Sequence, residues 1–343
     1  MLGGKDQKEL KRFIIPVLVT IGLIFLLFTQ ISLNDLYQLF KNIDLLWGLL
    51  GIAGYLFAIL FRSFRYRWLI HSRDISIANL FRISTFYHLS LMVLPSKLGE
   101  LSYPYFLNKL SGMPMTEGLA SLIASRIFDF FTILIIFFIA SIGFHRLFNI
   151  HPFWMVILIV FSIGLTLLAL FYMVALLKFS SLALGKISQW FNLSSHRSIR
   201  WVQQKIDDMA EDFLAIKAKR TYLAVTLATL ASWIMSYWMF YAFLKSFRVS
   251  ASFFDVVFGS TIAIIANVLP ISGIGNWGVL EAGWAAGFIL VGLSKVDAIA
   301  TGFGVHILLF LSSAVVSLLS WMTLKKHESP SHGTYPANEK GFD

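Results

Sequence analysis

The sequence predicts an all-α, polytopic membrane protein. Hydrophobic residues make up 57% of the 343 residues and charged residues only 13%, against about 25% charged residues in soluble domains. Mean hydropathy is +0.75, and several apolar runs approach the roughly 20 residues that a helix needs to cross about 30 Å of hydrocarbon. We therefore expect one transmembrane domain over residues 1–325, followed by a disordered cytoplasmic tail over residues 326–343.

Six apolar runs are predicted to cross the membrane completely. The first follows Lys8, Lys11 and Arg12. Its apolar core is long for a signal peptide and no small-residue cleavage site comes after it, so it is predicted to be retained. The six predicted spans are residues 13–31, 45–61, 119–144, 153–177, 222–244 and 298–324.

Two further segments are each broken by a proline. Residues 77–94 are long enough to cross but carry many polar side chains, and Pro95 ends their helix because it disfavours helix before it and removes a donor. The next piece, residues 98–110, is too short to cross. Asn267-Val-Leu-Pro270 repeats this pattern before a glycine-rich turn. Both segments are predicted to be re-entrant hairpins, over residues 77–110 and 253–293.

The distribution of basic residues favours this topology. With two re-entrant hairpins and a cytoplasmic N-terminus, most lysines and arginines lie in the cytoplasm, as expected for a membrane protein. If residues 77–94 crossed completely, the basic loop over residues 178–221 would face outward. This loop holds Lys178, Lys186, Arg197, Arg200, Lys205, Lys217, Lys219 and Arg220. Both termini are therefore predicted to be cytoplasmic.

The same topology makes the two hairpins enter from opposite sides. Similar units in opposite orientation form an inverted repeat, the usual plan of transporters with a site near the bilayer midplane. Residues 112–126 align without gaps on residues 292–306, which pairs Arg126 with His306. Within the basic loop, residues 199–216 have apolar side chains at helical spacing. They predict an interfacial helix, with a partner-binding helix as the alternative.

The net charge of +10 is explained by these cytoplasmic loops, so no nucleic-acid partner is expected. Arg65, Arg67 and Trp68 follow the second span directly, where guanidinium groups contact lipid headgroups and tryptophan lies at headgroup depth. A plain topology anchor explains these three residues equally well.

Charged residues inside apolar segments are costly and mark candidate sites. Glu100 and Glu281 each follow a proline-broken helix, near a helix N-terminus where free N–H groups bind an anion. In one interpretation each glutamate simply caps its helix and has no further role. Alternatively the two form a functional pair that is protonated during movement, or the helix ends bind a phosphate. Asp129 lies one turn after Arg126 within a span and could pair with it. Pairing for structure alone would be a costly way to hold a helix, so contact of Arg126 with a headgroup is favoured.

Enzyme signatures are missing from the sequence. We find no glycine-rich phosphate loop, no metal-ligating histidine pair on one helix face and no nucleophile elbow. No catalytic residue, metal or cofactor is therefore predicted, and an enzymatic role is disfavoured.

Several short motifs together resemble a known family. They are Arg67-Trp68, Leu94-Pro95 with Gly99-Glu100, Arg126 with Asp129, and Leu269-Pro270 through Gly278 to Glu281. In order and spacing they are similar to the flippase-like transmembrane family, the membrane region of lysylphosphatidylglycerol synthases, over roughly residues 10–325. In the loop before Gly99, Ser96-Lys97 stands where a small residue followed by a basic one is expected, so any departure from the family pattern is mild at most.

The resemblance implies a protein of a prokaryotic plasma membrane that moves lipids or lipid-linked compounds between leaflets. The protein is expected to be a stand-alone member of the family without the soluble aminoacyl-transferase domain, so lysyl transfer is not implied. Two alternatives remain: an enzyme acting on a lipid-linked sugar or aminoacyl lipid, and an accessory partner of a separate lipid-modifying synthase. The expected ligands are membrane lipids with anionic headgroups. The predicted transport residues are Pro95, Lys97, Gly99, Glu100, Arg126, Asp129, Asn267, Pro270, Gly278, Glu281 and His306.

Overall fold

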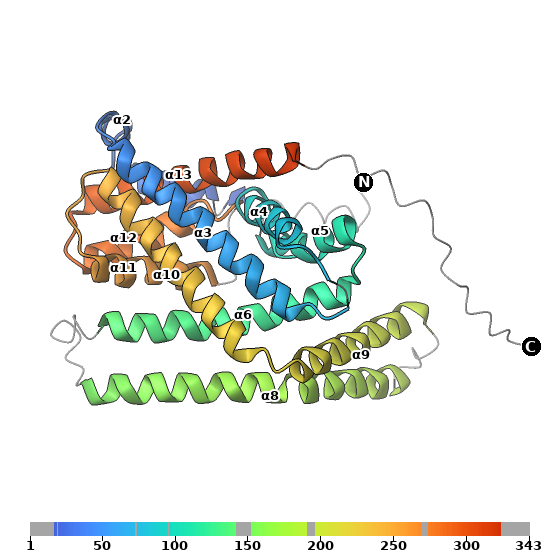
Figure 1. The fold of residues 1–343 in the computed structure, drawn as a ribbon. Helices are drawn as coiled ribbons and strands as arrows, with labels where there is room; N and C mark the ends of the chain where they lie inside the picture. Colours follow the sequence, from blue (N-terminus) through green and yellow to red (C-terminus); the bar gives the residue numbers. More distant parts are fainter. Residues whose placement is uncertain are drawn as a thin grey trace, which may run out of the picture.

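The computed structural model describes residues 17–18, 20–72, 74–94, 96–141, 152–190, 196–268 and 274–323. Within these ranges the protein is helical and has no β-strand, which confirms the all-α membrane fold (Figure 1). The predicted tail, Pro95 and Pro270 lie outside them. The helices are α2 (Leu33–Lys41), α3 (Leu45–Leu69), α4 (Ile77–Val93), η1 (Ser96–Gly99), α5 (Ser102–Ser111), α6 (Met115–Ser141), α8 (Pro152–Trp190), α9 (Arg197–Ala218), α10 (Tyr222–Ser246), α11 (Phe253–Val268), α12 (Val279–Leu290) and α13 (Lys295–Met322).

Among the described residues, four helices are long and apolar enough to cross a membrane: α3, α6, α10 and α13. The first predicted span is bent. Its helix over residues 20–28 meets α2 at 81°, and the two together form a fifth candidate span. The bend follows from the cap at Ser32, whose side chain accepts the Asp35 N–H while the Asp35 carboxylate accepts the Ser32 N–H. This reciprocal capping box starts a new helix there.

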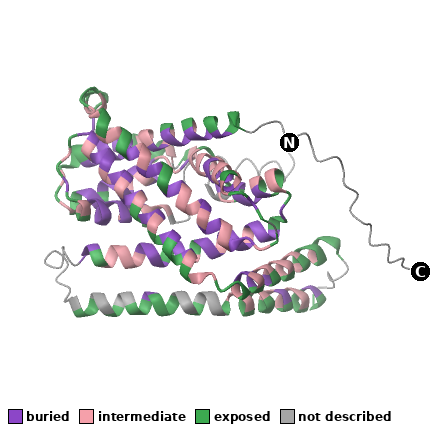
Figure 2. Ribbon diagram, viewed as in Figure 1, coloured by how far each residue is buried: buried purple, intermediate pink, exposed green. Residues whose placement is uncertain are grey.

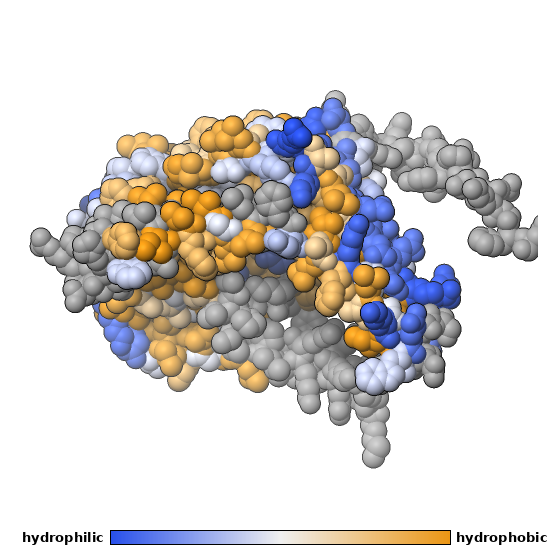
Figure 3. Space-filling model, turned by 90° about the horizontal axis from the view of Figure 1, so that it is seen from below, coloured by the Kyte–Doolittle hydropathy of each residue, from blue (hydrophilic) through white to orange (hydrophobic). Residues whose placement is uncertain are grey.

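Exposed side chains show the surface expected of a membrane protein. Large hydrophobic side chains remain exposed along α3, α8 and α13, among them Leu49, Phe161 and Leu318. On the face seen in Figure 3, hydrophobic residues cover the middle, and hydrophilic residues gather toward the right-hand end. Without a lipid phase such a surface would be unfavourable, because large exposed apolar patches are rare on soluble monomers.

The two proline-broken segments form the predicted helical hairpins. In the first hairpin, α4 and α5 run antiparallel, since Tyr87 packs on Tyr103 near the tip and Phe86 packs on Phe106 further from it. In the second hairpin, α11 and α12 approach so closely that a Cβ on Gly287 would lie 2.1 Å from the Gly259 carbonyl oxygen. Small residues at such positions let membrane helices pack backbone to backbone.

The tips of the two hairpins contact each other. The Gly275 N–H donates a hydrogen bond of 3.4 Å to the Leu94 carbonyl. Gly275 has φ +57°, and a Cβ there would lie 2.1 Å from the Met92 carbonyl oxygen. Glycine is therefore required by both the conformation and the close approach. The two hairpins, which are far apart in the sequence, thus meet at their tips.

The core consists of two clusters of buried side chains. One lies around α10 to α13 and includes Phe243, Trp284 and Phe288. The other joins α4, α5, α6 and α9 and includes Tyr103 and Leu107. Buried residues accordingly concentrate in the body of the molecule, whereas the outer side of α8 and α9 is largely exposed (Figure 2).

The basic loop differs from its prediction in two ways. α8 does not end at residue 177 but continues to Trp190 as one 39-residue helix, about 58 Å long at roughly 1.5 Å per residue. α9 covers the predicted amphipathic helix and runs back along α8 (Figure 1). Its apolar residues Phe213 and Ile216 are 4% and 5% exposed, because α6 and α8 cover them. Protein therefore covers this part of the apolar face, whereas Trp201 at the other end of α9 is exposed. An interfacial position of α9 stays a prediction.

Polar contacts fasten α9 to the loop after α3. Glu117 on α6 accepts the backbone N–H groups of His71 and Ser72 at 2.6 and 2.9 Å. The His71 ring lies between two carboxylates, with Nδ1 3.1 Å from Glu117 and Nε2 3.5 Å from Asp212 on α9. Burial raises the pKa of the Asp212 carboxyl, and the nearby His71 opposes this effect.

The predicted entry of the two hairpins from opposite sides of the membrane can be tested by labelling. Lys109 lies at the open end of the first hairpin and Ser250 at that of the second, and both are exposed. The two hairpins extend toward opposite ends of the molecule (Figure 1). Since the chain has no cysteine, Lys109→Cys and Ser250→Cys can be labelled singly in sealed vesicles with a membrane-impermeant maleimide. We expect labelling from opposite sides. Labelling from the same side would contradict opposite entry.

Candidate functional site

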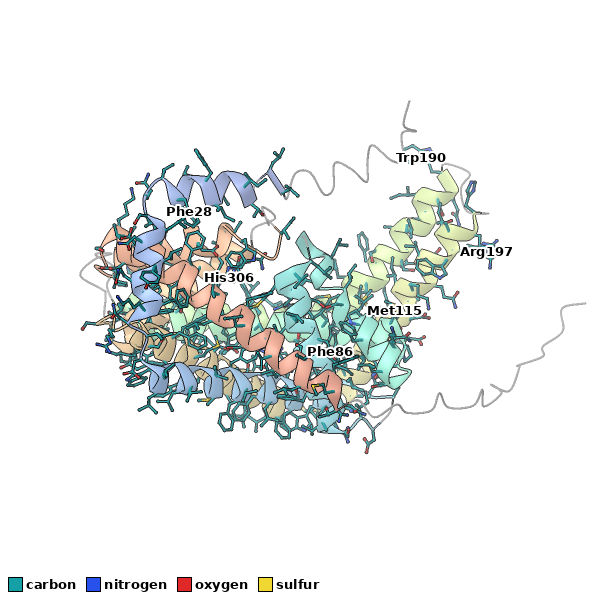
Figure 4. The ribbon with its side chains drawn as sticks, turned by 90° about the horizontal axis from the view of Figure 1, so that it is seen from above. Phe28, Phe86, Met115, Trp190, Arg197 and His306 are labelled. Carbon is teal, nitrogen blue, oxygen red and sulfur yellow. The ribbon has the colours of Figure 1, made fainter. Side chains whose placement is uncertain are left out.

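A cavity of about 230 Å³ lies where the two hairpin tips meet. Its walls come from α3, α4, α6, α10, α11, α12 and α13, with Gly275 and Asn276 between the arms of the second hairpin. Figure 4 places His306, one of its lining residues, in the helical body, away from the α8–α9 end marked by Trp190 and Arg197. The charged and titratable residues that line it are Arg62, Arg65, His88, Arg126, Asp129 and His306, together with Tyr55, Tyr66 and Tyr87.

Arg65 and Asp129 form a buried ion pair at one wall. The Arg65 Nη1 lies 2.5 Å from the Asp129 carboxylate, and their side chains are only 2% and 7% exposed. The Trp233 indole N–H donates to the same carboxylate oxygen at 2.7 Å. Asp129 therefore pairs chiefly with Arg65, because Arg126 approaches it only to 3.7 Å. The predicted pair of Asp129 and Arg126 is thus present, but as the longer of the two ion pairs that Asp129 makes.

The burial of Arg65 also corrects its predicted place at the headgroup interface. α3 turns this side chain toward α6 and α10, and the guanidinium lies 5.3 Å from the Tyr66 ring centroid. Arg67 remains at the surface, where it lies 2.7 Å from Asp74. Trp68 is partly buried against the second cluster. A role of Arg67 and Trp68 in headgroup contact stays a prediction.

Glu100 and Arg126 form the second polar group of the cavity. The Arg126 Nη2 lies 2.7 Å from both Glu100 carboxylate oxygens and donates to the Tyr87 hydroxyl at 2.5 Å. Tyr87 in turn donates to Glu100 at 2.8 Å. Gly99 allows this arrangement, because a Cβ there would lie 2.9 Å from the Leu91 Cα. The Arg126 side chain is still 44% exposed, so its guanidinium can reach a ligand.

Glu281 and His306 form the corresponding group at the second hairpin. The Glu281 carboxylate lies 2.6 Å from the His306 Nδ1 and accepts the Gly278 N–H at 2.7 Å through its other oxygen. The Trp277 ring stacks on the imidazole, with centroids 4.1 Å apart. Both side chains are buried, at 0% and 1% exposure. Glu281 is thus a helix cap and a partner of His306 at the same time.

The two glutamate–base pairs match each other in position along the chain. Glu100 and Arg126 are separated by 26 residues, and Glu281 and His306 by 25. In each pair the glutamate stands at the start of the second hairpin arm and the base on the following long helix. The sequence alignment already matched Arg126 with His306, but it did not predict that each would contact the nearby glutamate.

Arg62 is a site residue that the sequence reasoning missed. Its guanidinium donates to His88 Nε2 and, at 3.2 Å, to the Ser236 hydroxyl, and it lies 5.6 Å from the Trp233 ring centroid. No carboxylate forms an ion pair with it in the described part of the chain. The available signal was its spacing from Tyr55 and Arg65, seven and three residues away, which places all three on one face of α3.

The other predicted site residues have different outcomes. Asn267 lines the cavity, and its Oδ1 is buried without a hydrogen-bond partner in the described ranges. The backbone of Lys97 lies in η1, but its side chain is outside the described structure. Among described residues, no group of three or more His, Asp or Glu side chains could hold a metal ion.

The family comparison agrees with this architecture. The family model described as "Lysylphosphatidylglycerol synthase TM region" matches residues 13–317. The chain belongs to this family. As a member of the lysylphosphatidylglycerol synthase transmembrane family it is an integral membrane protein with a membrane-lipid-related function. No curated protein and no solved structure is similar enough to count as a match.

Proposed function

We propose that the protein moves a lipid with an anionic headgroup between membrane leaflets, and that the headgroup binds in the cavity between the hairpin tips. The observation that carries the proposal is Arg62, a cation that lines the cavity and forms no ion pair with a carboxylate of the described residues. A charge within a membrane domain is costly, and a bound phosphate would supply the missing anion. Arginine suits this role because its planar fork matches phosphate oxygens.

The cavity size supports a headgroup rather than a whole lipid. Its volume of about 230 Å³ is below the roughly 300–1,000 Å³ of pockets that enclose drug-sized ligands. The acyl chains would therefore remain in the bilayer while the phosphate reaches Arg62. Arg126 becomes a second ligand when the phosphate replaces the Glu100 carboxylate on its guanidinium. Glu100 then acts as the anion that holds Arg126 between transport events.

The matched glutamate–base pairs support an inverted repeat around this cavity. In such a repeat the hairpins enter from opposite sides and the site lies near the midplane, which suits alternating access. The proposed setting is a prokaryotic plasma membrane with both termini in the cytoplasm, as the basic-residue count predicts. Acid–base catalysis is less well supported, because each glutamate is already engaged by a basic partner.

Arg62→Gln is expected to slow lipid exchange about tenfold to a hundredfold, because a hydrogen bond to a charged group contributes roughly 1.5–3 kcal/mol. The measurement is transbilayer movement of a fluorescent phosphatidylglycerol in vesicles containing the purified protein. Arg82→Gln is the matched control, since Arg82 lies on α4 and contacts Asn79 and Thr323 outside the cavity. Wild-type exchange in Arg62→Gln would contradict the proposed site. A chemically altered lipid would instead indicate an enzyme.

A further inference from the structure

The two glutamate–base pairs differ in one chemical property. The Arg126 guanidinium is permanently charged, so the Glu100 carboxylate always faces a cation. The base of the second pair, His306, is an imidazole, a side chain that can be neutral or carry a positive charge. The two pairs therefore share one geometry but differ in their bases. The base of the first pair, Arg126, keeps its charge, whereas that of the second pair, His306, can gain or lose a proton.

We propose that the Glu281–His306 pair is a proton site that couples proton movement to lipid transport. This inference rests on the proposed function. The hydrogen bond of the His306 ring to another described residue runs through Nδ1 to Glu281, which leaves Nε2 as the ring nitrogen available to a proton. Since His306 lines the cavity, a proton arriving there bonds to the Nε2 lone pair. The pair then changes from one net negative charge to neutral, with imidazolium facing carboxylate.

The surroundings of His306 determine how this charge change affects a ligand. The other charged or titratable residues lining the cavity are Tyr55, Arg62, Arg65 and Tyr66 on α3, Tyr87 and His88 on α4, and Arg126 and Asp129 on α6. Asp129 is held by Arg65, and His88 Nε2 already accepts from Arg62. His306 is thus the lining residue with a free ring nitrogen and a carboxylate behind it.

Binding of an anionic headgroup and of the proton are linked through this cavity. A bound phosphate favours the added positive charge on His306, and the protonated imidazole in turn favours the phosphate, because such coupling is reciprocal. Release of the proton on the other side of the membrane would weaken the hold on the headgroup. This difference between the two sides gives transport a direction.

The test uses vesicles that contain the full-length protein and fluorescent phosphatidylglycerol, with an imposed pH gradient and an internal pH dye. For the wild-type protein we expect the exchange rate to change with the size and sign of the gradient, and protons to enter with the lipid. Glu281→Gln and His306→Arg are both expected to lose this dependence. Asp297→Asn, at the exposed start of α13, is the control and should keep it.

The two variants test the pair in different ways. Glu281→Gln keeps the side-chain length and an oxygen that can accept the Gly278 N–H, so we expect it to fold. His306→Arg gives the second pair the fixed charge of the first. If Arg does not fit at this buried position, as a lowered melting temperature would show, Glu281→Gln decides alone.

The outcomes separate the two proposals. Wild-type lipid exchange that is equal with and without a gradient would overturn the coupling and leave transport intact. Gradient-dependent exchange that persists in Glu281→Gln would overturn the assignment to this pair. Absence of lipid exchange under every condition would overturn both the coupling and the proposed function.

Discussion

Asp129→Leu is expected to lower the free energy of unfolding by about 3–5 kcal/mol, the cost of leaving one partner of a buried ion pair uncompensated. Arg65 would lose the carboxylate 2.5 Å from its Nη1 while remaining 2% exposed. The Trp233 indole N–H would lose its acceptor as well. The measurement is thermal or chemical unfolding of the detergent-solubilised protein, followed by tryptophan fluorescence.

The double variant Arg65→Met/Asp129→Leu shows whether the loss comes from the unpaired charge. Replacing both members of a buried pair by apolar residues is often neutral or stabilising, so we expect the double variant to unfold at higher temperature than Asp129→Leu alone. If the double variant is as unstable as the single one, the loss comes from packing and the uncompensated charge is not its cause.

Gly287→Ala is expected to destabilise the second hairpin by about 1–3 kcal/mol, the usual cost of overpacking. The added Cβ would lie 2.1 Å from the Gly259 carbonyl oxygen and 2.9 Å from its carbon. These are backbone atoms that cannot rotate away, so α11 and α12 must separate. Since both hairpin arms contribute to the cavity wall, lipid exchange should fall together with the melting temperature.

The control for this prediction is Gly48→Ala in α3. A Cβ on Gly48 would meet no atom within 4 Å. Alanine is favoured over glycine in a helix by up to about 1 kcal/mol, so this variant should be as stable as the wild type or slightly more stable. A loss in Gly48→Ala equal to that in Gly287→Ala would contradict an effect of close helix packing.

Local signals predicted the helices and both hairpins. Apolar length marks the long helices α3, α6, α10 and α13. Polar composition with a following proline marks α4, and the Asn267-Val-Leu-Pro270 pattern marks the end of α11. Such signals depend on the bilayer and on backbone chemistry, so they act on each segment independently of the rest of the fold. A local signal also marks Glu100 and Glu281 as candidate site residues, because a charged side chain within an apolar segment is costly.

Features set by packing between helices were not predictable. Four arginines after residue 61 suggest an interface anchor, but the rotation of α3 against α10 turns Arg62 and Arg65 inward. Residues 178–190 are too polar to indicate a span. α8 nevertheless continues through them to Trp190, and α9 packs along this part of the helix. Spacing alone could suggest that Arg62 and Arg65 share a face, but not which way that face points.

The contact between the hairpin tips has a consequence for opening. Among the described residues, one backbone hydrogen bond links the tips, from Gly275 to Leu94 at 3.4 Å, and a typical intramolecular hydrogen bond contributes about 0.5–1.5 kcal/mol net. Breaking this bond therefore costs little more than thermal energy. Backbone hydrogen bonding between the described parts of the two tips thus adds little resistance to their separation.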